Sequence, residues 1–134
     1  MIELHDTAEI EAHVAAQRDW ALRYEQLSPG RFHGRLQQIR LPGMTLMRER
    51  VAPATRQRGA LDPAAYGLAI PLSEAGSVFF HGQRVQPGAI MCGRGNELDL
   101  TTPVDFDLTA VVVESTLLAS VWERVFDAPI AAWL

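Results

Sequence analysis

Two arginines on one predicted strand are the residues best placed to bind a ligand. Arg48 and Arg50 are separated by one residue, so both side chains point to the same face of the strand. A guanidinium group can hold a carboxylate through two parallel hydrogen bonds. Leu46 shares this face, and an apolar residue beside two arginines fits an inward surface that holds an anionic ligand. The alternative is an outward charged face, with Met47 and Val51 directed into the core.

Two further side chains, Tyr66 and His81, are candidate ligand contacts. Tyr66 is the aromatic residue best suited to a pocket, because its hydroxyl requires a partner when the ring is buried. His33 and His81 could meet across a barrel, and Glu97 could then complete a metal site. A strand histidine without a closely spaced second histidine more often forms an ordinary hydrogen bond or lies at the surface. The sequence therefore predicts neither a metal nor a cofactor.

The other reactive side chains indicate no catalysis. His5 and His13 fall in the N-terminal segment and are expected to face solvent. Cys92 is the single cysteine, which excludes an intramolecular disulfide. Its neighbours are Met91 and Gly93, and a cysteine in such a setting is typically a small core residue rather than a nucleophile. No serine lies in a nucleophile elbow, and no pair of carboxylates has a spacing that requires acid–base chemistry. We predict that the protein is not an enzyme.

Helices are predicted at the two ends of the chain. The first covers residues 6–28, because side chains recur there at helical spacing and Pro29 and Gly30 would end the helix. Its expected stripe consists of Ile10, Val14, Gln17, Ala21 and Tyr24. The second covers residues 115–127. Its apolar stripe, Leu117 to Val125 with Trp122, could pack on the barrel or form a dimer seam, and packing on the barrel is expected.

The segment between these helices, residues 31–114, is predicted to be a β-barrel. Short strand-like segments recur there with turn signals between them, including Pro42 and Gly43 in a hairpin turn. The expected strands include 44–51, 65–72, 77–81, 89–92, 97–101 and 106–114. This pattern favours an antiparallel sandwich or small barrel over alternating strands and helices. The 134 residues are therefore expected to form a single domain.

Composition and charge narrow the class of partner. The chain has 16 acidic and 12 basic residues, and all of the basic residues are arginine. A domain that binds duplex DNA normally carries a basic face, so a chain of net charge -4 is not expected to hold nucleic acid by itself. The N-terminus has no signal-peptide pattern, and no segment approaches the ~20 apolar residues that span a bilayer. We predict a cytoplasmic protein without a membrane partner.

One glycine-rich segment resembles a known superfamily motif. Residues 82–88, Gly-Gln-Arg-Val-Gln-Pro-Gly, are followed by Ala-Ile-Met and resemble the second half-motif of the cupin superfamily. A metal-binding cupin would place a histidine shortly after this turn, where Met91 and Cys92 stand here. The first half-motif, with its two histidines and a glutamate, is missing. The resemblance implies a cupin-like barrel and no cupin metal site.

The chain as a whole resembles the N-terminal sensor domains of AraC-type transcriptional regulators. Residues 20–36 contain Leu-Ser-Pro-Gly-Arg-Phe-His-Gly, which matches that family's "Leu-x-Pro-Gly-x-Phe-x-Gly" pattern after an aromatic-bearing helix. The segments 46–50, 66–72 and 82–88 follow in matching order and spacing, and the stretch 93–100 fits as well. The resemblance covers about Asp6 to Val125. Its motifs are structural glycines, prolines and apolar positions rather than chemical groups.

This resemblance implies a cupin-like antiparallel β-barrel that senses an unknown small-molecule effector and helps a homodimer form. The family reads DNA through two C-terminal helix-turn-helix motifs. No such module fits within residues 1–134, so we expect this chain to come from a longer protein and to reach DNA only through the missing part. The alternatives are a small cupin enzyme of the isomerase or dioxygenase type and a ligand-free interaction module with a filled barrel.

Overall fold

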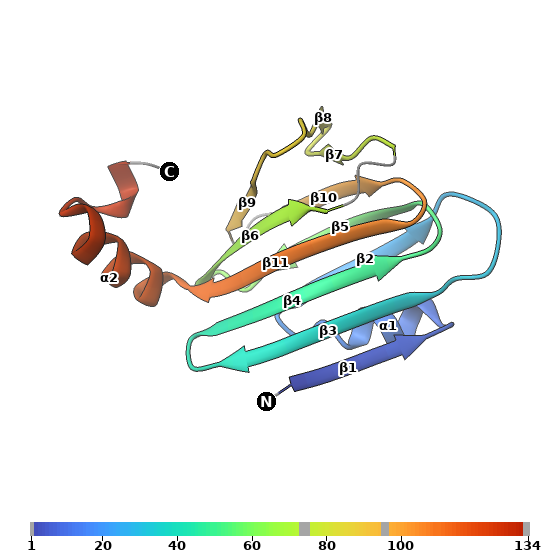
Figure 1. Cartoon of the computed structure of the whole chain (residues 1–134), viewed down its shortest axis with the longest axis horizontal. Helices are drawn as coiled ribbons and strands as arrows, with labels where there is room; N and C mark the ends of the chain where they lie inside the picture. The colour runs from blue at the N-terminus through green and yellow to red at the C-terminus, as the bar shows by residue number, and fades with distance from the viewer. Residues whose placement is uncertain (1, 73–75, 95–96, 133–134) are drawn as a thin grey trace.

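The strands of the protein form two antiparallel sheets that lie face to face (Figure 1). The computed structural model describes residues 2–72, 76–94 and 97–132. Among these residues, one sheet has six strands in the order β1 (Ile2–Thr7), β3 (Gly34–Leu41), β4 (Met44–Val51), β11 (Phe106–Glu114), β6 (Ala65–Pro71) and β9 (Met91–Arg94). The other has five strands in the order β2 (Trp20–Gln26), β5 (Thr55–Leu61), β10 (Glu97–Thr102), β7 (Phe79–Phe80) and β8 (Gln83–Arg84).

The core lies between the two sheets, because the strands alternate inward apolar residues with outward polar ones. In β11, the inward residues Phe106, Leu108, Ala110 and Val112 are all buried. They meet buried residues of both sheets, such as Leu100 from β10. The predicted class, a mainly β, cupin-like antiparallel fold with flanking helices, is confirmed by this architecture.

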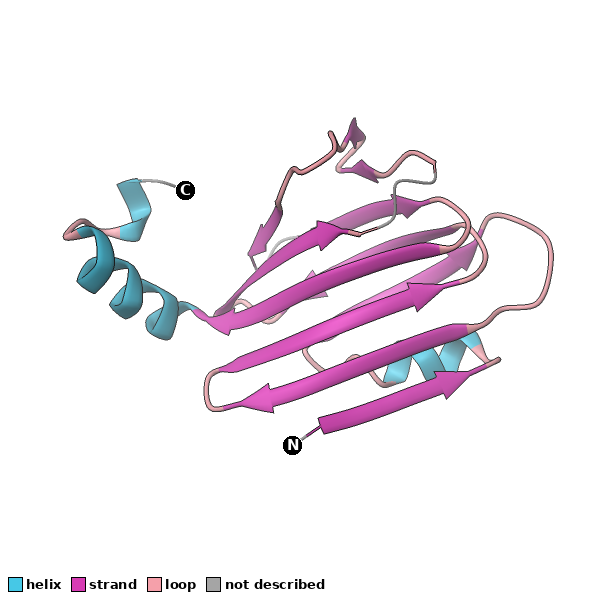
Figure 2. Cartoon of the chain, in the orientation of Figure 1, coloured by secondary structure: helices cyan, strands magenta, loops and turns pink. Residues whose placement is uncertain are grey.

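The predicted N-terminal helix over 6–28 is wrong. The chain forms β1, a short helix α1 (Ile10–Ala15) and then β2, as Figure 2 shows in colours of secondary structure. In β2, Trp20, Leu22 and Tyr24 are more buried than the residues between them, which is the period of a strand. Trp20 and Tyr24 are also four residues apart, which is the spacing of one face of a helix. Pairing with β5 selects the strand. The β-structure thus begins at Ile2 rather than at residue 31.

Most of the strand segments expected within 31–114 are present. The hairpin at Pro42 and Gly43 connects β3 to β4, and Gly43 adopts a φ of 74°. The segment 55–61 forms β5, in the middle of the smaller sheet, although its arginines and glycine do not read as a strand. Its burial pattern still alternates, with Thr55, Gln57 and Leu61 buried.

The C-terminal helix, α2 (Ser115–Phe126), projects away from the sheets (Figure 1). None of its residues is fully buried, so the predicted packing of the whole stripe on the barrel is wrong. Its first turn touches the β3–β4 turn, where Leu117 leaves no room for a side chain at Gly43. A short 3₁₀ helix (Ile130–Ala132) follows. Within the described part of the chain, no helix has the length and apolar character required to cross a membrane.

Gly59 in β5 provides a test of the packing between β2 and β5. A Cβ atom at this position would lie 1.9 Å from the carbonyl oxygen of Ala21. Because that atom belongs to the neighbouring strand's backbone, Gly59→Ala should destabilise the protein by about 1–3 kcal/mol in urea denaturation. Gly93→Ala is the matched control, since a Cβ atom at Gly93 would meet no atom within 4 Å. Equal stability of the two variants would contradict this strand pairing.

Candidate functional site

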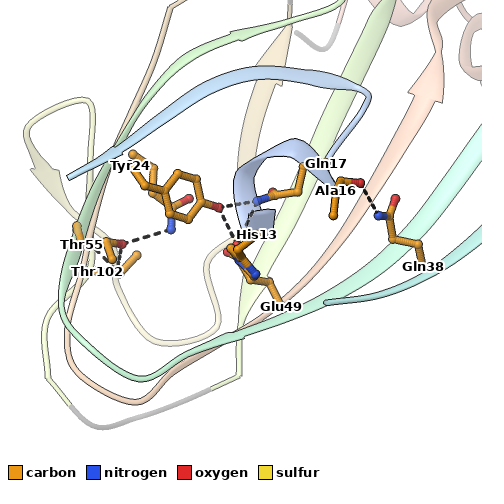
Figure 3. A network of polar contacts seen from close by, with 9 residues as sticks. His13, Ala16, Gln17, Tyr24, Gln38, Glu49, Thr55 and Thr102 are labelled. Atoms are coloured by element: carbon orange, nitrogen blue, oxygen red, sulfur yellow. Dashed lines mark hydrogen bonds and ion pairs between the residues drawn. The ribbon is translucent and has the colours of Figure 1, made fainter. Parts of the chain in front are cut away.

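A buried carboxylate, that of Glu49, lies at the centre of a polar cluster inside the fold (Figure 3). Glu49 points to the inner face of β4, as Met47 and Val51 do. Its Oε2 atom lies 2.7 Å from Nε2 of His13 and accepts a hydrogen bond of 2.5 Å from the Tyr24 hydroxyl. Gln17 Nε2 donates to Glu49 Oε2 at 3.3 Å and to the Tyr24 hydroxyl oxygen at 2.8 Å. One carboxylate oxygen is therefore shared by three side chains.

The N-terminal segment brings these partners to Glu49. His13 lies on α1, Gln17 in the turn that follows and Tyr24 on β2. Gln38 of β3 anchors the end of α1, because its buried amide donates a hydrogen bond of 2.8 Å to the carbonyl oxygen of Ala16 (Figure 3). The network is thus set by tertiary contacts between segments that are distant in the sequence.

The His13 ring is fully enclosed. It packs edge-on against Tyr24 and Phe32, with ring centroids 5.7 and 5.5 Å apart. On another side the ring meets the backbone of Gly34, where an added Cβ would lie 2.3 Å from Nδ1. The prediction that His13 faces solvent is therefore wrong. The apolar residues before and after it in α1 do not reveal this burial, which depends on contacts with β3 and β4.

The hydrogen bonds of this cluster converge on one carboxylate oxygen. Tyr24 and Gln17 donate to Oε2, and Nε2 of His13 faces the same atom. We assign the Nε2–H tautomer to His13, because Nδ1 is buried without a partner among the described residues and an acceptor there costs less than an unmatched N–H. Glu49 Oε1 is also buried and has no hydrogen-bond partner among those residues.

Glu49 also lines an apolar cavity of about 40 Å³ between the sheets. Most of the wall is aliphatic or aromatic, and it includes Trp20, Met47, Phe80, Leu100 and Ala110. Gln17 and Gln57 line it as well, and the amide of Gln57 donates to Thr55 at 3.2 Å. A cavity of this volume has room for about three or four non-hydrogen atoms. The protein thus places an apolar cavity beside the buried Glu49 cluster.

A second, adjoining pocket contains one of the predicted ligand contacts. This pocket of about 70 Å³ is lined by His81, Cys92 and Arg94, and it shares Trp20, Gly93 and Leu98 with the cavity beside Glu49. His81 is exposed and has a φ of 51°. The predicted role of His81 as a ligand contact remains a prediction. Cys92 is exposed. Its neighbours had predicted a small core residue, and this prediction is wrong.

Tyr66 lies outside both of these pockets. Its hydroxyl accepts a hydrogen bond of 3.4 Å from Arg94, whose guanidinium carbon is 5.7 Å from the centroid of the Tyr66 ring. Arg94 therefore connects Tyr66 to the pocket that contains His81. A direct contact between Tyr66 and a ligand remains a prediction.

Arg48 and Arg50 lie on the outer face of β4, which confirms the outward alternative with Met47 and Val51 in the core, and the inward arrangement is wrong. The inner face of β4 carries the buried side chains of Met47, Glu49 and Val51 instead. Arg48 forms a bidentate ion pair with Asp107 of β11, with distances of 3.1 and 2.7 Å, and Arg50 lies 3.8 Å from the same carboxylate. Arg50 also lines a surface depression of about 290 Å³ with His33 and Arg35. Binding of an anion there remains a prediction.

The residues of the Glu49 cluster were not recognisable from the sequence as a site. His13, Gln17 and Tyr24 appear in a segment whose spacing resembles a helix. Glu49 stands between two arginines and looks like part of a charged surface. One signal was available, because an inward Met47 and Val51 require Glu49 to point inward as well.

The metal site that His33, His81 and Glu97 could form is not assembled by the described residues. No group of three histidine, cysteine, aspartate or glutamate side chains within that part of the chain could hold a metal ion. His33 Nε2 instead lies 2.5 Å from Oδ1 of Asp6 at the surface. The side chain of Glu97, the third candidate ligand, lies outside the described part.

The fold is shared with an AraC-like transcriptional activator. No family model matches the sequence. The chain superimposes on the activator CuxR with a TM-score of 0.61 and 11% identity, over 92% of this chain and 51% of the activator. It also matches a predicted oxalate decarboxylase from Thermotoga maritima (TM-score 0.49, 13% identity, covering 70% of this chain and 94% of that one). A cupin-2 domain protein from Rhodospirillum rubrum matches with a TM-score of 0.46 and 15% identity, over 85% and 86% of the two chains.

The likeness to CuxR extends to the fold alone at this level of identity. This chain spans about half of the activator's length.

Tyr24 is expected to report on the buried network at high pH. Burial raises the pKa of Tyr24 well above its usual value, and the charge of Glu49 adds to this effect. A raised pKa in the folded state means that the associated stability is present below the unfolded value of about 10 and is lost as the pH rises. Tyr24→Phe should cost about 1–3 kcal/mol at pH 7 and should remove part of this loss above pH 10. Parallel pH–stability curves for the two proteins would contradict the predicted shift.

Asp107, on the outer face of the larger sheet, should affect the stability of the protein at low pH. Hydrogen bonds from Arg48 lower the pKa of Asp107, and the positive charges of Arg48 and Arg50 lower it further. A lowered pKa stabilises the folded state above the usual carboxyl range, and this gain disappears as the pH falls through the folded value. Asp107→Asn should therefore lower the melting temperature at pH 7, with a difference that shrinks below about pH 4. Glu123→Gln on exposed α2 is the control, and a constant difference down to pH 2 would contradict the assignment.

Proposed function

We propose that this chain is the effector-sensing and dimerisation domain of a cytoplasmic AraC-type transcriptional regulator. The observation that carries this proposal is the apolar cavity between the sheets, which adjoins the buried Glu49 cluster. A sensor domain requires an enclosed site with few polar groups, since apolar walls supply affinity and a single polar group supplies selectivity. The fold shared with the activator CuxR supports the family assignment.

The sensing step would act through the N-terminal segment. A ligand beside Glu49 lies close to Gln17 of that segment and to Trp20 of β2, which also line the cavity. A ligand that binds one arrangement of these elements more tightly than another shifts the population toward the first. The change would reach DNA through helix-turn-helix motifs outside this chain.

Dimerisation is proposed for the exposed face of α2. Val121, Val125 and Phe126 are exposed on this helix, and Trp122 packs against Phe126 with ring centroids 4.4 Å apart. Since the helix projects from the sheets, two copies could place their helices side by side without any change in the barrels (Figure 1). The apolar surface that becomes buried would stabilise the pair.

A chimeric regulator tests the sensing role. The chain would replace the sensor half of an AraC-type activator, and transcription of its reporter gene would be measured against a library of small metabolites. At least one compound should change reporter expression and should raise the melting temperature of the purified chain, because a ligand that binds the folded state stabilises it.

Ala110→Val supplies the control for this experiment. Ala110 lines the cavity and is buried, so two added methyl groups would occupy the space that a ligand needs. The variant should lose the response to the compound while it still activates the reporter at its basal level.

A purified chain that contains stoichiometric iron, zinc or manganese and turns over a substrate would overturn the proposal in favour of a cupin enzyme. A chain that no compound stabilises would favour an interaction module.

A further inference from the structure

We propose that the apolar face of α2 binds across the outer face of the larger sheet of a second copy of this chain. The second copy returns the same contact, so that the two helices lie side by side as each crosses to its partner. This inference rests on the proposed dimerisation, since it names the surface that α2 contacts.

A row of apolar side chains crosses the outer face of the larger sheet. Residues directly opposite each other in antiparallel strands point to the same face. The register therefore brings one outward residue of each of the six strands into line: Ile2, Ile39, Leu46, Val111, Leu68 and Cys92. None of these six side chains is fully buried, and Ile2 is 78% exposed. We call this line the outer row.

Neighbouring positions widen the apolar surface around the outer row. Leu41 lies on the side nearer to α2, Leu4 and Ile70 lie on the other side, and all three are exposed. The charges beside Leu4 and Ile70 belong to Arg48 and Asp107, which already bind each other, so a partner that covers them leaves neither without a counter-charge. A contiguous apolar patch of this kind marks an interaction site.

The α2 helix of the same chain does not cover the outer row. Ser115 begins the helix directly after β11, and Leu117 lies against Gly43 in the β3–β4 turn. These contacts direct the helix away from the sheets. Figure 1 shows the outer face of the larger sheet turned toward the viewer, with no described helix across it. The row is therefore available to another molecule.

The α2 helix presents an apolar surface of the complementary kind. Leu118, Val121 and Val125 recur at helical spacing, whereas Glu123 and Arg124 lie on the opposite side of the helix. Val121 and Val125 are 40% and 66% exposed. An apolar helix face and an apolar sheet face are surfaces that pack against each other in layered folds. The chain thus carries both halves of such a contact, and two copies can exchange them.

The dimensions of the two surfaces agree. The 12 residues of α2 give a helix about 18 Å long. The outer row crosses six strands and spans about 24 Å, because neighbouring strands lie about 4.8 Å apart. A helix of this length can therefore lie along the row within its limits.

The area that a stable dimer needs favours the reciprocal arrangement. Somewhat less than half of the surface of such a helix amounts to about 300 Å². With a similar area of the sheet, one contact buries about 600 Å², which is typical of crystal packing. Two-fold symmetry repeats the contact and raises the total to about 1,200 Å², the lower limit of specific stable interfaces.

Aspartate substitutions on the two surfaces test the interface on the purified chain. Sedimentation equilibrium should show a dimer, and its dissociation constant should rise about thirtyfold or more in Val125→Asp and in Ile39→Asp. Val104→Asp is the control, because Val104 is 49% exposed in the β10–β11 turn, at the end of the sheet away from α2. It should leave the dissociation constant unchanged.

Disulfide formation between copies identifies the surfaces that meet, and it covers the case in which an aspartate variant does not fold. Cys92→Ser removes the native thiol from every chain used. Val125→Cys is then mixed with Ile39→Cys or with Leu68→Cys, which sample the outer row in β3 and β6. Under mild oxidation, a mixed disulfide should form with at least one of them, in higher yield than either chain forms with itself.

The other outcomes separate this interface from dimerisation itself. A dimer in which Val125→Cys pairs with itself alone would show helices that contact each other and not the sheet, and it would overturn this inference while dimerisation stands. Pairing of Ile39→Cys with itself alone would do the same. A disulfide within a single chain that carries both cysteines would show that α2 covers its own sheet, which also overturns the inference. A monomer at every concentration would overturn the proposed dimerisation as well.

Discussion

The carboxylate of Glu49 joins three parts of the chain that are far apart in the sequence. It lies on β4 of the larger sheet, and it holds His13 from α1 and Tyr24 from β2 of the smaller sheet. The position of the whole N-terminal segment depends on this group, because each partner would keep a buried polar atom without a counterpart if the carboxylate were removed. Such unmatched atoms cost about 1–3 kcal/mol each. The sheets therefore close over a polar centre and not over a purely apolar core.

The same centre borders the cavity, and two features of this region lower the stability of the fold. A cavity that lacks packing atoms forfeits dispersion contacts, and the buried Glu49 oxygen without a hydrogen-bond partner among the described residues adds a desolvation cost. A chain selected for stability alone would fill the space near Ala110 with a larger side chain.

Much of the fold could be predicted from local patterns, whereas the site could not. Alternation and turn residues indicated β3, β4 and β11, since these signals involve neighbouring residues. The strand β2 was missed because Trp20 and Tyr24 satisfy both a helical and a strand spacing, and only pairing with β5 decides between them. Glu49 was not recognised as part of a site, because its hydrogen-bond partners come from other segments and leave no local trace. The alternation along β4 indicated that Glu49 points inward, but it did not indicate which side chains Glu49 would contact there.

Gly34 carries a consequence for how sequences of this fold can vary. Its missing side chain makes room for the imidazole of His13, and even a methyl group there would overlap the ring, with the added carbon 2.3 Å from Nδ1. The two positions therefore form a pair of complementary sizes. A relative with a larger residue at position 34 must have given up the histidine at position 13, and with it one of the donors to Glu49. A histidine at position 13 should accordingly occur only together with glycine at position 34, and their joint presence marks the chains that retain this buried centre.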